Sequence, residues 1–308
     1  FINMPLLRLI KKETKIKFMK LKKVTLLVSF LFFLISISAI FFKGLNLGID
    51  FTGGTLIEVR FNEKINLNDI RSTMNNLNLG EIQLQTIGNE NDIIIRVQEK
   101  QIINDNESKT IQIVKEALNE KNVEYRRTEF VGPKVGNELV KAGIIAVLFS
   151  LIGILIYIWL RFKWNFAVGA IIALIHDVIL TLGFFSILNL EFNLATVAAV
   201  LTIAGYSIND TVVIYDRIRD TMRKYKEVSF DEVINISLNG TLSRTLMTSL
   251  TTLLALFALF IFGGVVISSF IIALIWGVLI GTYSSLYVAS PILTYLKSDN
   301  RKEIDRNI

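Results

Sequence analysis

One stretch of the sequence decides the fold class: Val24-Thr-Leu-Leu-Val-Ser-Phe-Leu-Phe-Phe-Leu-Ile-Ser-Ile-Ser-Ala-Ile-Phe-Phe42. It contains 19 residues and no charge, and a helix needs roughly 20 predominantly apolar residues to cross the hydrocarbon core of a bilayer. The apolar region of a cleaved signal peptide is shorter, at roughly 7–15 residues. We therefore predict a permanent membrane span at 24–42.

Five further apolar stretches are predicted to be membrane spans for the same reason. Hydrophobic residues make up 52% of the 308-residue chain and charged residues only 19%, whereas soluble domains are roughly a quarter charged. One soluble core of this size could not bury so much apolar surface. We therefore predict an α-helical polytopic membrane protein with six transmembrane helices, of which the last five occupy 139–293. These five are Leu139–Leu160, Phe166–Leu188, Asn193–Tyr215, Leu246–Phe262 and Val265–Leu293.

Lysine and arginine are distributed unevenly over the short segments between the predicted spans. Residues 1–23 contain eight of them. Together with two at 161–163, five at 217–226 and four in the tail 294–308, they account for 19 of the 33 basic residues, while the short connections on the other side contain none. Short cytoplasmic segments are enriched in Lys and Arg. We therefore predict that both termini are cytoplasmic and that residues 43–138 are extracytoplasmic.

Residues 43–138 differ in composition from the spans and are predicted to form a small separate domain. Alternating apolar residues indicate strands, and apolar residues at helical spacing indicate two helices. Gly88-Asn89-Glu90-Asn91, between the second and third strands, is typical of a hairpin turn. The resulting order β-α-β-β-α-β is that of a ferredoxin-like α+β domain. The predicted elements are Thr55–Phe61, Leu67–Leu77, Glu81–Ile87, Asp92–Val97, Glu107–Glu120 and Val123–Val131.

The composition of this domain argues against several classes of function. It contains no histidine and no arrangement of metal ligands or nucleophiles, so we expect no metal, no cofactor and no enzymatic activity. Acidic residues outnumber basic residues in it, which argues against a nucleic-acid surface. The whole chain lacks cysteine, which excludes disulfides and thiolate chemistry. The expected role is that of a compact binding or lever domain.

Asp210 is the most informative ionisable residue within the predicted spans. It lies in Ile203-Ala-Gly-Tyr-Ser-Ile-Asn-Asp-Thr-Val-Val-Ile214, near the end of the fourth span. A charge at the centre of a bilayer costs roughly 2.5–3.5 kcal/mol, so such residues usually face a bundle interior or a water-filled cavity. We interpret Asp210 as a carboxylate that carries a proton or another ion. The alternative is a structural hydrogen bond near the helix end.

Arg244 is the candidate partner of Asp210. It stands at the cytoplasmic edge of the fifth predicted span, where an arginine can extend its side chain to the membrane surface. Its predicted depth matches that of Asp210, and an arginine can hold a carboxylate through a bidentate pair. A nearby cation favours the ionised carboxylate, so a cation that moves away would promote proton uptake. Thr248, one turn further on, is placed to hydrogen-bond either partner.

His176-Asp177 lies near the middle of the third predicted span and contains the only histidine of the chain. One histidine and one aspartate cannot hold a metal without further ligands. Adjacent residues point about 100° apart on a helix, so the two side chains are not expected to share a face. Two interpretations stay open, namely polar packing against a neighbouring helix and a proton-relay role.

Five short motifs, in order along most of the chain, resemble the signatures of one family. Together they are similar to the SecD/SecF family of bacterial protein-export membrane proteins. The modest size of the domain at 43–138 favours the SecF branch over the SecD branch, whose outer domain is much larger. The motifs are Gly48-Ile-Asp-Phe-Thr-Gly-Gly-Thr55, Phe130-Val-Gly-Pro-Lys-Val-Gly136, Ala173-Leu-Ile-His-Asp-Val178, Gly205-Tyr-Ser-Ile-Asn-Asp-Thr-Val-Val-Ile-Tyr-Asp-Arg-Ile-Arg219 and Ser243-Arg-Thr-Leu-Met-Thr248.

The resemblance implies half of an RND-type transporter in the bacterial cytoplasmic (inner) membrane, with one large outer loop after the first span. It implies that SecD supplies the other half, and that the heterodimer uses the proton-motive force to help unfolded polypeptides finish crossing the membrane. It assigns the key carboxylate to Asp210 and its partner cation to Arg244. The implied partners are SecD, the SecYEG translocon, the exported polypeptide, membrane lipid and, as a further candidate, YajC. The implied structural signature is Gly48, Asp50, Phe51, Gly53, Gly54 and Thr55.

Three other functions stay open from the residues alone. An RND-like exporter of a small molecule or lipid would use the same carboxylate and would need a substrate cleft in the outer domain. A membrane enzyme built on His176-Asp177 would need a bound metal. A passive scaffold would depend on neither Asp210 nor Arg244.

Overall fold

The computed structural model describes residues 14–62, 66–77, 79–87, 89–98, 107–119, 123–264 and 267–296. The chain divides into two compact units. The bundle unit extends to Leu45, resumes at Val147–Leu190 and continues from Ala198, and the sheet unit contains Asn46–Ala146 and Glu191–Val197. Several predicted features lie outside the described residues: the basic residues up to position 13, Gly88 of the predicted hairpin, Val265 at the start of the predicted sixth span, and the tail from position 297.

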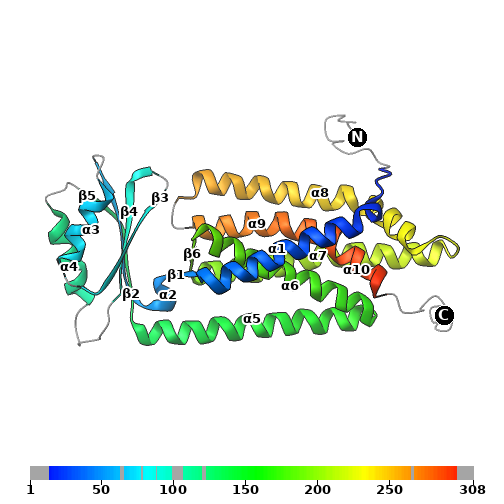
Figure 1. The fold of residues 1–308 in the computed structure, drawn as a ribbon, viewed down its shortest axis with the longest axis horizontal. Coiled ribbons are helices and arrows are strands. Elements are labelled where there is room, and N and C mark those ends of the chain that lie inside the picture. Colours follow the sequence, from blue (N-terminus) through cyan, green and yellow to red (C-terminus); the bar gives the residue numbers. More distant parts are fainter. Residues whose placement is uncertain are drawn as a thin grey trace, which may run out of the picture. The chain divides into compact units, whose positions relative to one another are not determined.

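Six helices within the described residues are long and apolar enough to cross a membrane (Figure 1). Helices suit this task because their backbone hydrogen bonds are satisfied internally. Two of them, α7 and α8, extend several turns beyond the apolar stretches, since the polar sequence there also favours a helix. The six are α1 (Lys22–Lys43), α5 (Pro133–Arg161), α6 (Trp164–Leu188), α7 (Leu194–Lys224), α8 (Phe230–Phe262), and α9 (Ser268–Ser284) with its continuation η4 (Ser285–Ala289) and α10 (Ser290–Tyr295).

Glycines allow helices of the bundle to approach each other closely. A Cβ atom added at Gly183 of α6 would lie 2.3 Å from the Cβ of Ser36 in α1. One added at Gly277 of α9 would lie 2.2 Å from Cγ1 of Ile203 in α7. Both distances are far below van der Waals contact, so these pairs of helices can pack in this way only because the glycines have no side chain.

The last apolar helix changes its hydrogen-bonding pattern near its C-terminal end. η4 is a π-helical turn, and Pro291 follows as the second residue of α10. Proline lacks an N–H, and its ring clashes with the carbonyl four residues earlier, which disfavours a regular α-helix through this point. The Ser290 hydroxyl donates to the Ser285 carbonyl oxygen at 2.9 Å and so satisfies a backbone group of the π-helical turn.

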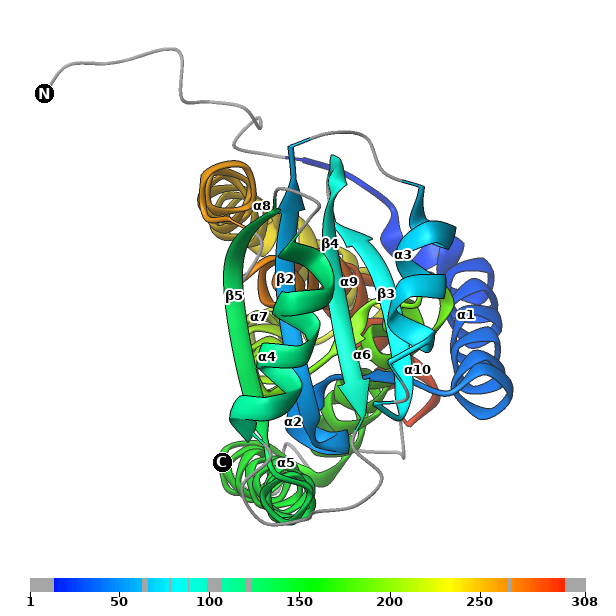
Figure 2. The ribbon, with the colours of Figure 1, turned by 90° about the vertical axis from the view of Figure 1, so that its left-hand side faces the viewer.

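The sheet unit contains a four-stranded antiparallel sheet with the order β3-β4-β2-β5. The helices α3 and α4 lie on the same face of this sheet (Figure 2). The strand order and the sequence of elements, β2-α3-β3-β4-α4-β5, are those of the predicted ferredoxin-like domain. The bounds are β2 (Gly54–Phe61), α3 (Leu67–Asn75), β3 (Glu81–Ile87), β4 (Asn89–Gln98), α4 (Glu107–Leu118) and β5 (Val123–Val131).

The two faces of the sheet are buried by different partners, because successive side chains of a strand point to opposite faces. Ile57 and Ile95 belong to the core between the sheet and the helices α3 and α4. Leu56 and Ile94 belong to a second cluster on the other face, which includes a residue of the short helix α2 (Ile49–Thr52). The sheet therefore has its main core on one face and a small apolar cluster on the other.

Three small elements were not predicted from the sequence. They are α2 and the two strands β1 (Asn46–Leu47) and β6 (Glu191–Phe192), which pair in parallel. Elements of two to four residues have too short a pattern for periodicity to identify them. The predicted hairpin turn was also too long, because Ile87 pairs with Asn89 and the predicted turn residues from Asn89 on lie within β4.

Candidate functional site

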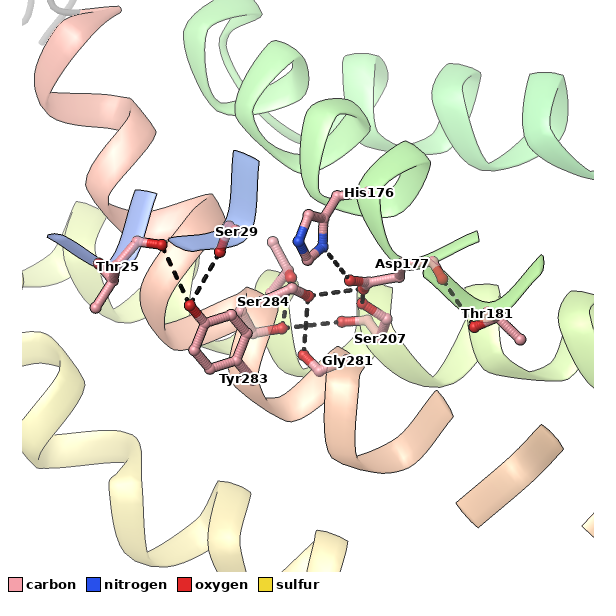
Figure 3. A network of polar contacts seen from close by, with 11 residues as sticks. Thr25, Ser29, His176, Asp177, Thr181, Ser207, Gly281, Tyr283 and Ser284 are labelled. Atoms are coloured by element: carbon pink, nitrogen blue, oxygen red, sulfur yellow. Dashed lines mark hydrogen bonds and ion pairs between the residues drawn. The ribbon is translucent and has the colours of Figure 1, made fainter. Parts of the chain in front are cut away.

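Asp177 of α6 is the centre of a hydrogen-bond network in the bundle (Figure 3). Its side chain is fully buried. Its Oδ2 atom accepts hydrogen bonds from Ser207 Oγ of α7 at 2.5 Å and from Ser284 Oγ of α9 at 2.7 Å. A buried carboxylate needs such donors, because an unpaired charge is very unfavourable in apolar surroundings. The network therefore joins α6, α7 and α9 at one point.

His176 also contributes to this network. Its Nδ1 atom lies 3.0 Å from Oδ1 of Asp177, so the two adjacent side chains contact each other, contrary to the expectation from their 100° separation. The second ring nitrogen, Nε2, is buried and has no hydrogen-bond partner among the described residues. Each oxygen of the Asp177 carboxyl group thus has a polar partner, His176 Nδ1 on Oδ1 and the two serine hydroxyls on Oδ2.

The contact between α7 and α9 remains polar beyond Asp177. The Ser285 hydroxyl lies 2.8 Å from Thr211 Oγ1 and donates to the Ser207 carbonyl oxygen at 3.3 Å. A Cβ atom added at Gly281 would lie 3.0 Å from the Cβ of Ser207, so the two helices are close together here. Ser284 and Ser285 are adjacent to or within the π-helical turn, and such turns are frequent at functional sites.

The helix α1 is attached to the same part of α9. The Tyr283 hydroxyl lies 2.9 Å from Ser29 Oγ and 3.3 Å from the carbonyl oxygen of Thr25 (Figure 3). Tyr283 immediately precedes Ser284, the donor to Asp177. Hydrogen bonds at neighbouring positions of α9 therefore reach α1, α6 and α7.

Asp210 of α7 lies one helical turn after Ser207 and has different surroundings. The residue is 4% exposed, and its Oδ2 atom is buried without a hydrogen-bond partner among the described residues. Among the described residues, no basic side chain forms an ion pair with it. Most buried polar atoms have partners, so a buried carboxylate oxygen without one requires an explanation.

Arg244 of α8 is the basic residue whose charge acts on Asp210. It is exposed in this chain, and the two side chains interact through space without direct contact. Thr248 Oγ1 donates to the carbonyl oxygens of Arg244 at 3.2 Å and Thr245 at 2.9 Å. The Thr248 hydroxyl therefore bonds the backbone of its own helix. A direct bond between Asp210 and Arg244 would need a movement of at least one of the two side chains.

The glycines of the signature loop are required by close backbone contacts within the sheet unit. Gly54 has φ +118°, and a Cβ atom on it would lie 2.3 Å from the carbonyl oxygen of Val97. Gly53 also has a positive φ, +71°, a region that residues with side chains rarely adopt. A Cβ atom at Gly48 would lie 2.8 Å from Oε1 of Glu191. The loop therefore lies directly against β4 and β6.

The other signature residues hold neighbouring elements of the same unit. Oδ2 of Asp50 accepts a hydrogen bond from the backbone N–H of Leu194, the first residue of α7, at 2.8 Å. The ring of Phe51 stacks on Phe192 of β6, with 6.0 Å between the centroids. Thr55 is fully buried within β2. A carboxylate at the first turn of a helix is favourable because of the helix dipole and the free N–H groups there.

Sequence analysis missed Ser207 and Ser284 as partners of Asp177. Serine is common in apolar helices, and a single sequence does not show which serine faces which helix. No pattern in the sequence therefore identified the two serines as donors to Asp177. Among the described residues, no group of three or more His, Asp or Glu side chains is arranged to hold a metal ion.

Comparison with known proteins identifies the family. The family model described as "Protein export membrane protein SecD/SecF, C-terminal" matches residues 110–299, and the SecD/SecF GG motif matches residues 38–65. The chain belongs to the SecD/SecF family. It is 47% identical to the protein translocase subunit SecF of Rickettsia rickettsii over 97% of this chain and 98% of that protein. It is 49% identical to SecF of Rickettsia bellii over 94% and 95%.

These relatives make the chain a member of the SecF type, and they are named as translocase subunits rather than as enzymes. The SecF-type chain also matches the crystal structure of SecDF from Thermus thermophilus, described as translocon-associated, with a TM-score of 0.85 and 34% identity. It matches SecDF in a super-membrane-facing form with a TM-score of 0.68. The match to the first of these structures includes 93% of this chain and 39% of the solved SecDF chain. The match confirms the predicted fold class.

Proposed function

We propose that this chain and SecD form a heterodimer that uses the proton-motive force to assist Sec-dependent export of unfolded polypeptides. In this proposal it lies in the bacterial cytoplasmic membrane, with both termini in the cytoplasm and the sheet unit outside. SecYEG is its neighbour, and YajC is a further partner. Membership of the SecD/SecF family supports the proposal, as does the likeness to SecDF, which is described as translocon-associated.

One observation carries the proposal: Asp210 is buried in a membrane-spanning helix without a direct partner among the described residues. A carboxylate in this environment is suited to gaining and losing a proton, because no ion pair or hydrogen bond holds its Oδ2 atom in one state. Arg244 attracts the ionised form from a distance. Proton uptake removes this attraction, and a charge change of this kind can shift a bundle between two arrangements.

The available energy is sufficient for such a shift. One unit charge that crosses a potential of 100 mV releases about 2.3 kcal/mol. This free energy changes the ratio of two states by about fiftyfold, because 1.36 kcal/mol corresponds to a factor of ten. The outer sheet unit would then act on the emerging polypeptide. Thr248, whose hydroxyl bonds the backbone carbonyl of Arg244, is the third residue of the proposed coupling site.

We assign the mobile proton to Asp210 and a supporting role to Asp177 and His176. Both oxygens of the Asp177 carboxyl group have hydrogen-bond partners, and such partners favour one charge state over the other. A group that must change its charge in every cycle is better served by the unpaired carboxylate of Asp210. The relay interpretation of His176 would require a path from its Nε2 atom to another titratable group.

The experiment is the Asp210→Asn variant of the full chain in membrane vesicles that also contain SecD and SecYEG. The completion of export of a precursor protein is measured with and without a proton-motive force. We expect Asp210→Asn to lose the stimulation by the proton-motive force and to retain the basal rate. Asp220→Asn, an exposed carboxylate later on the same helix, is the matched control and should behave as the wild type. Normal stimulation in Asp210→Asn would refute the proposal.

A further inference from the structure

A largely buried ion pair in the sheet unit links the central sheet to the segment that leads into α7. Nη2 of Arg96 in β4 donates to Oε2 of Glu191 in β6, and the two side chains are 5% and 14% exposed. Arg96 pairs in register with Leu56 of β2, so it projects from the sheet face opposite to α3 and α4. Arginine and glutamate are almost never buried unless they are paired, so each of these charges depends on the other.

The same short segment is held by four further contacts within the sheet unit. β6 pairs with β1 in parallel, and the Gly48 N–H donates to the Phe192 carbonyl oxygen at 2.9 Å. Phe51 stacks on the Phe192 ring. Asp50 accepts from the first N–H of α7. A simple turn between two membrane helices would need none of these contacts, so the segment is built to be fixed to the sheet.

This segment lies in the sheet unit, although it begins a helix that continues into the bundle unit. The residues Glu191–Val197, including the first turn of α7, belong to the compact unit of the sheet, whereas Asp210 on the same helix belongs to the bundle unit. α7 is one uninterrupted helix between these points. A regular helix is stiff over this length, so a displacement of one part is carried to the other.

We propose that Arg96, Glu191 and Asp50 are positioning residues that form a closed joint between the sheet and the first turn of α7. The joint transmits movement of the helix that carries Asp210 to the outer sheet, and it stays closed throughout the transport cycle. This inference rests on the proposed function, since it assumes that α7 moves when Asp210 changes its charge. It assigns to Arg96 and Glu191 a role in coupling, without contact to the proton or to the exported polypeptide.

The first experiment removes the ion pair and then restores it with reversed charges. The full chain is tested with SecD and SecYEG in membrane vesicles as Glu191→Gln, Arg96→Glu, Glu191→Arg and the Arg96→Glu/Glu191→Arg double variant. We expect each single variant to lose stimulation by the proton-motive force by roughly fivefold or more, with the basal rate preserved. The double variant should recover a large part of it. The matched control is Glu129→Gln, which breaks the more exposed pair of Glu129 with Arg127 in the same sheet.

The second experiment holds the joint closed by a covalent bond. The chain has no cysteine, so a Leu47→Cys/Phe192→Cys variant introduces the only pair, at facing positions of β1 and β6. Facing residues of neighbouring strands are within the range of Cα separations that a disulfide bridges. We expect the oxidised variant to keep its stimulation by the proton-motive force, and the same disulfide to rescue Glu191→Gln.

The outcomes separate the joint from the proposed function. Full stimulation in Glu191→Gln refutes the proposed joint. So does stimulation of the Leu47→Cys/Phe192→Cys variant that is lost on oxidation and regained on reduction. If only the basal rate falls, the ion pair stabilises the fold alone, and the joint is again overturned. Asp210→Asn is run in parallel: its loss of stimulation together with a fully active Glu191→Gln rejects the joint and retains the proposed function, whereas a fully active Asp210→Asn rejects the proposed function.

Discussion

Replacing Gly54 by alanine tests whether the signature loop is needed for the sheet. Gly54 is the first residue of β2 and has φ +118°. An added Cβ atom would lie 2.3 Å from the Val97 carbonyl oxygen and 3.2 Å from Cα of Gln98. These are backbone atoms of β4, so the clash cannot be relieved by a change of rotamer. The β2–β4 pair must separate locally or the loop must change its path.

The magnitude follows from two separate costs. A residue with a side chain in a glycine-only backbone region costs about 1–3 kcal/mol. Forcing extra atoms into a packed site costs about 1–3 kcal/mol more. Their sum, about 2–6 kcal/mol, is a large part of the roughly 5–15 kcal/mol by which a domain is stable. We therefore expect Gly54→Ala to open the sheet measurably or to prevent its formation.

Hydrogen exchange of the full chain in detergent is the appropriate assay. Peptides from β2 and β4 should exchange at least about thirtyfold faster in Gly54→Ala, since 2 kcal/mol corresponds to this factor, while peptides from α8 are unchanged. Gly132→Ala is the matched control, because a Cβ atom there would meet nothing within 4 Å. Unchanged protection of β2 and β4 in Gly54→Ala would refute this account of the loop.

Two other predictions concern the bundle and the pH dependence of the sheet unit. Gly183→Ala should be less stable than Gly153→Ala by about 1–3 kcal/mol, because both gain the same helix propensity but only the first meets a neighbouring helix; equal thermal midpoints in detergent would contradict this packing. Burial raises the pKa of the Glu58 carboxyl. The sheet unit is therefore more stable when Glu58 is protonated. This stability is complete below the ordinary Glu pKa and is lost as the pH rises through the raised pKa. Glu58→Gln should therefore stabilise the sheet unit at neutral pH but not in acid, as measured by hydrogen exchange of β4 corrected for the intrinsic rate. A hydrogen bond from Arg60 lowers the pKa of the Asp92 carboxyl. The ionised Asp92 therefore stabilises the sheet unit above the ordinary Asp pKa, and this stability is lost as the pH falls through the lowered pKa. The control Asp92→Asn should accordingly be destabilising at neutral pH.

The overall fold could be predicted because it depends on local sequence properties. A membrane span must be a continuous apolar segment of a certain length, and each of the six spans has such a segment. The alternation of apolar residues in strands such as Glu81–Ile87 and Val123–Val131 gave bounds that agree with the structure. Elements of two to four residues, such as β1 and α2, have too few residues for any pattern and depend on their tertiary contacts.

The candidate site could be predicted only in part, because its geometry depends on contacts between distant residues. A single acidic residue within an apolar helix marks Asp210, since its insertion is costly without a purpose. Nothing in the sequence marks Ser284 as a donor to Asp177, or Arg96 as the partner of Glu191, 95 residues away. Glycine positions such as Gly54 indicate backbone constraints, but the atoms that impose them are known only from the structure.

The different surroundings of Asp177 and Asp210 indicate which helix contact changes in the proposed transport cycle. Ser207 joins α7 to Asp177 through a bond of 2.5 Å to a carboxylate, and hydrogen bonds to charged groups are roughly twice as strong as neutral ones. The bond from Tyr206 of α7 to Ser249 of α8 is 3.4 Å long, near the limit of a hydrogen bond. In the proposed cycle, a charge change at Asp210 therefore acts on this weaker contact between α7 and α8, the helix that carries Arg244. In the proposed cycle, the displacement of α7 reaches the sheet unit through the first turn of that helix.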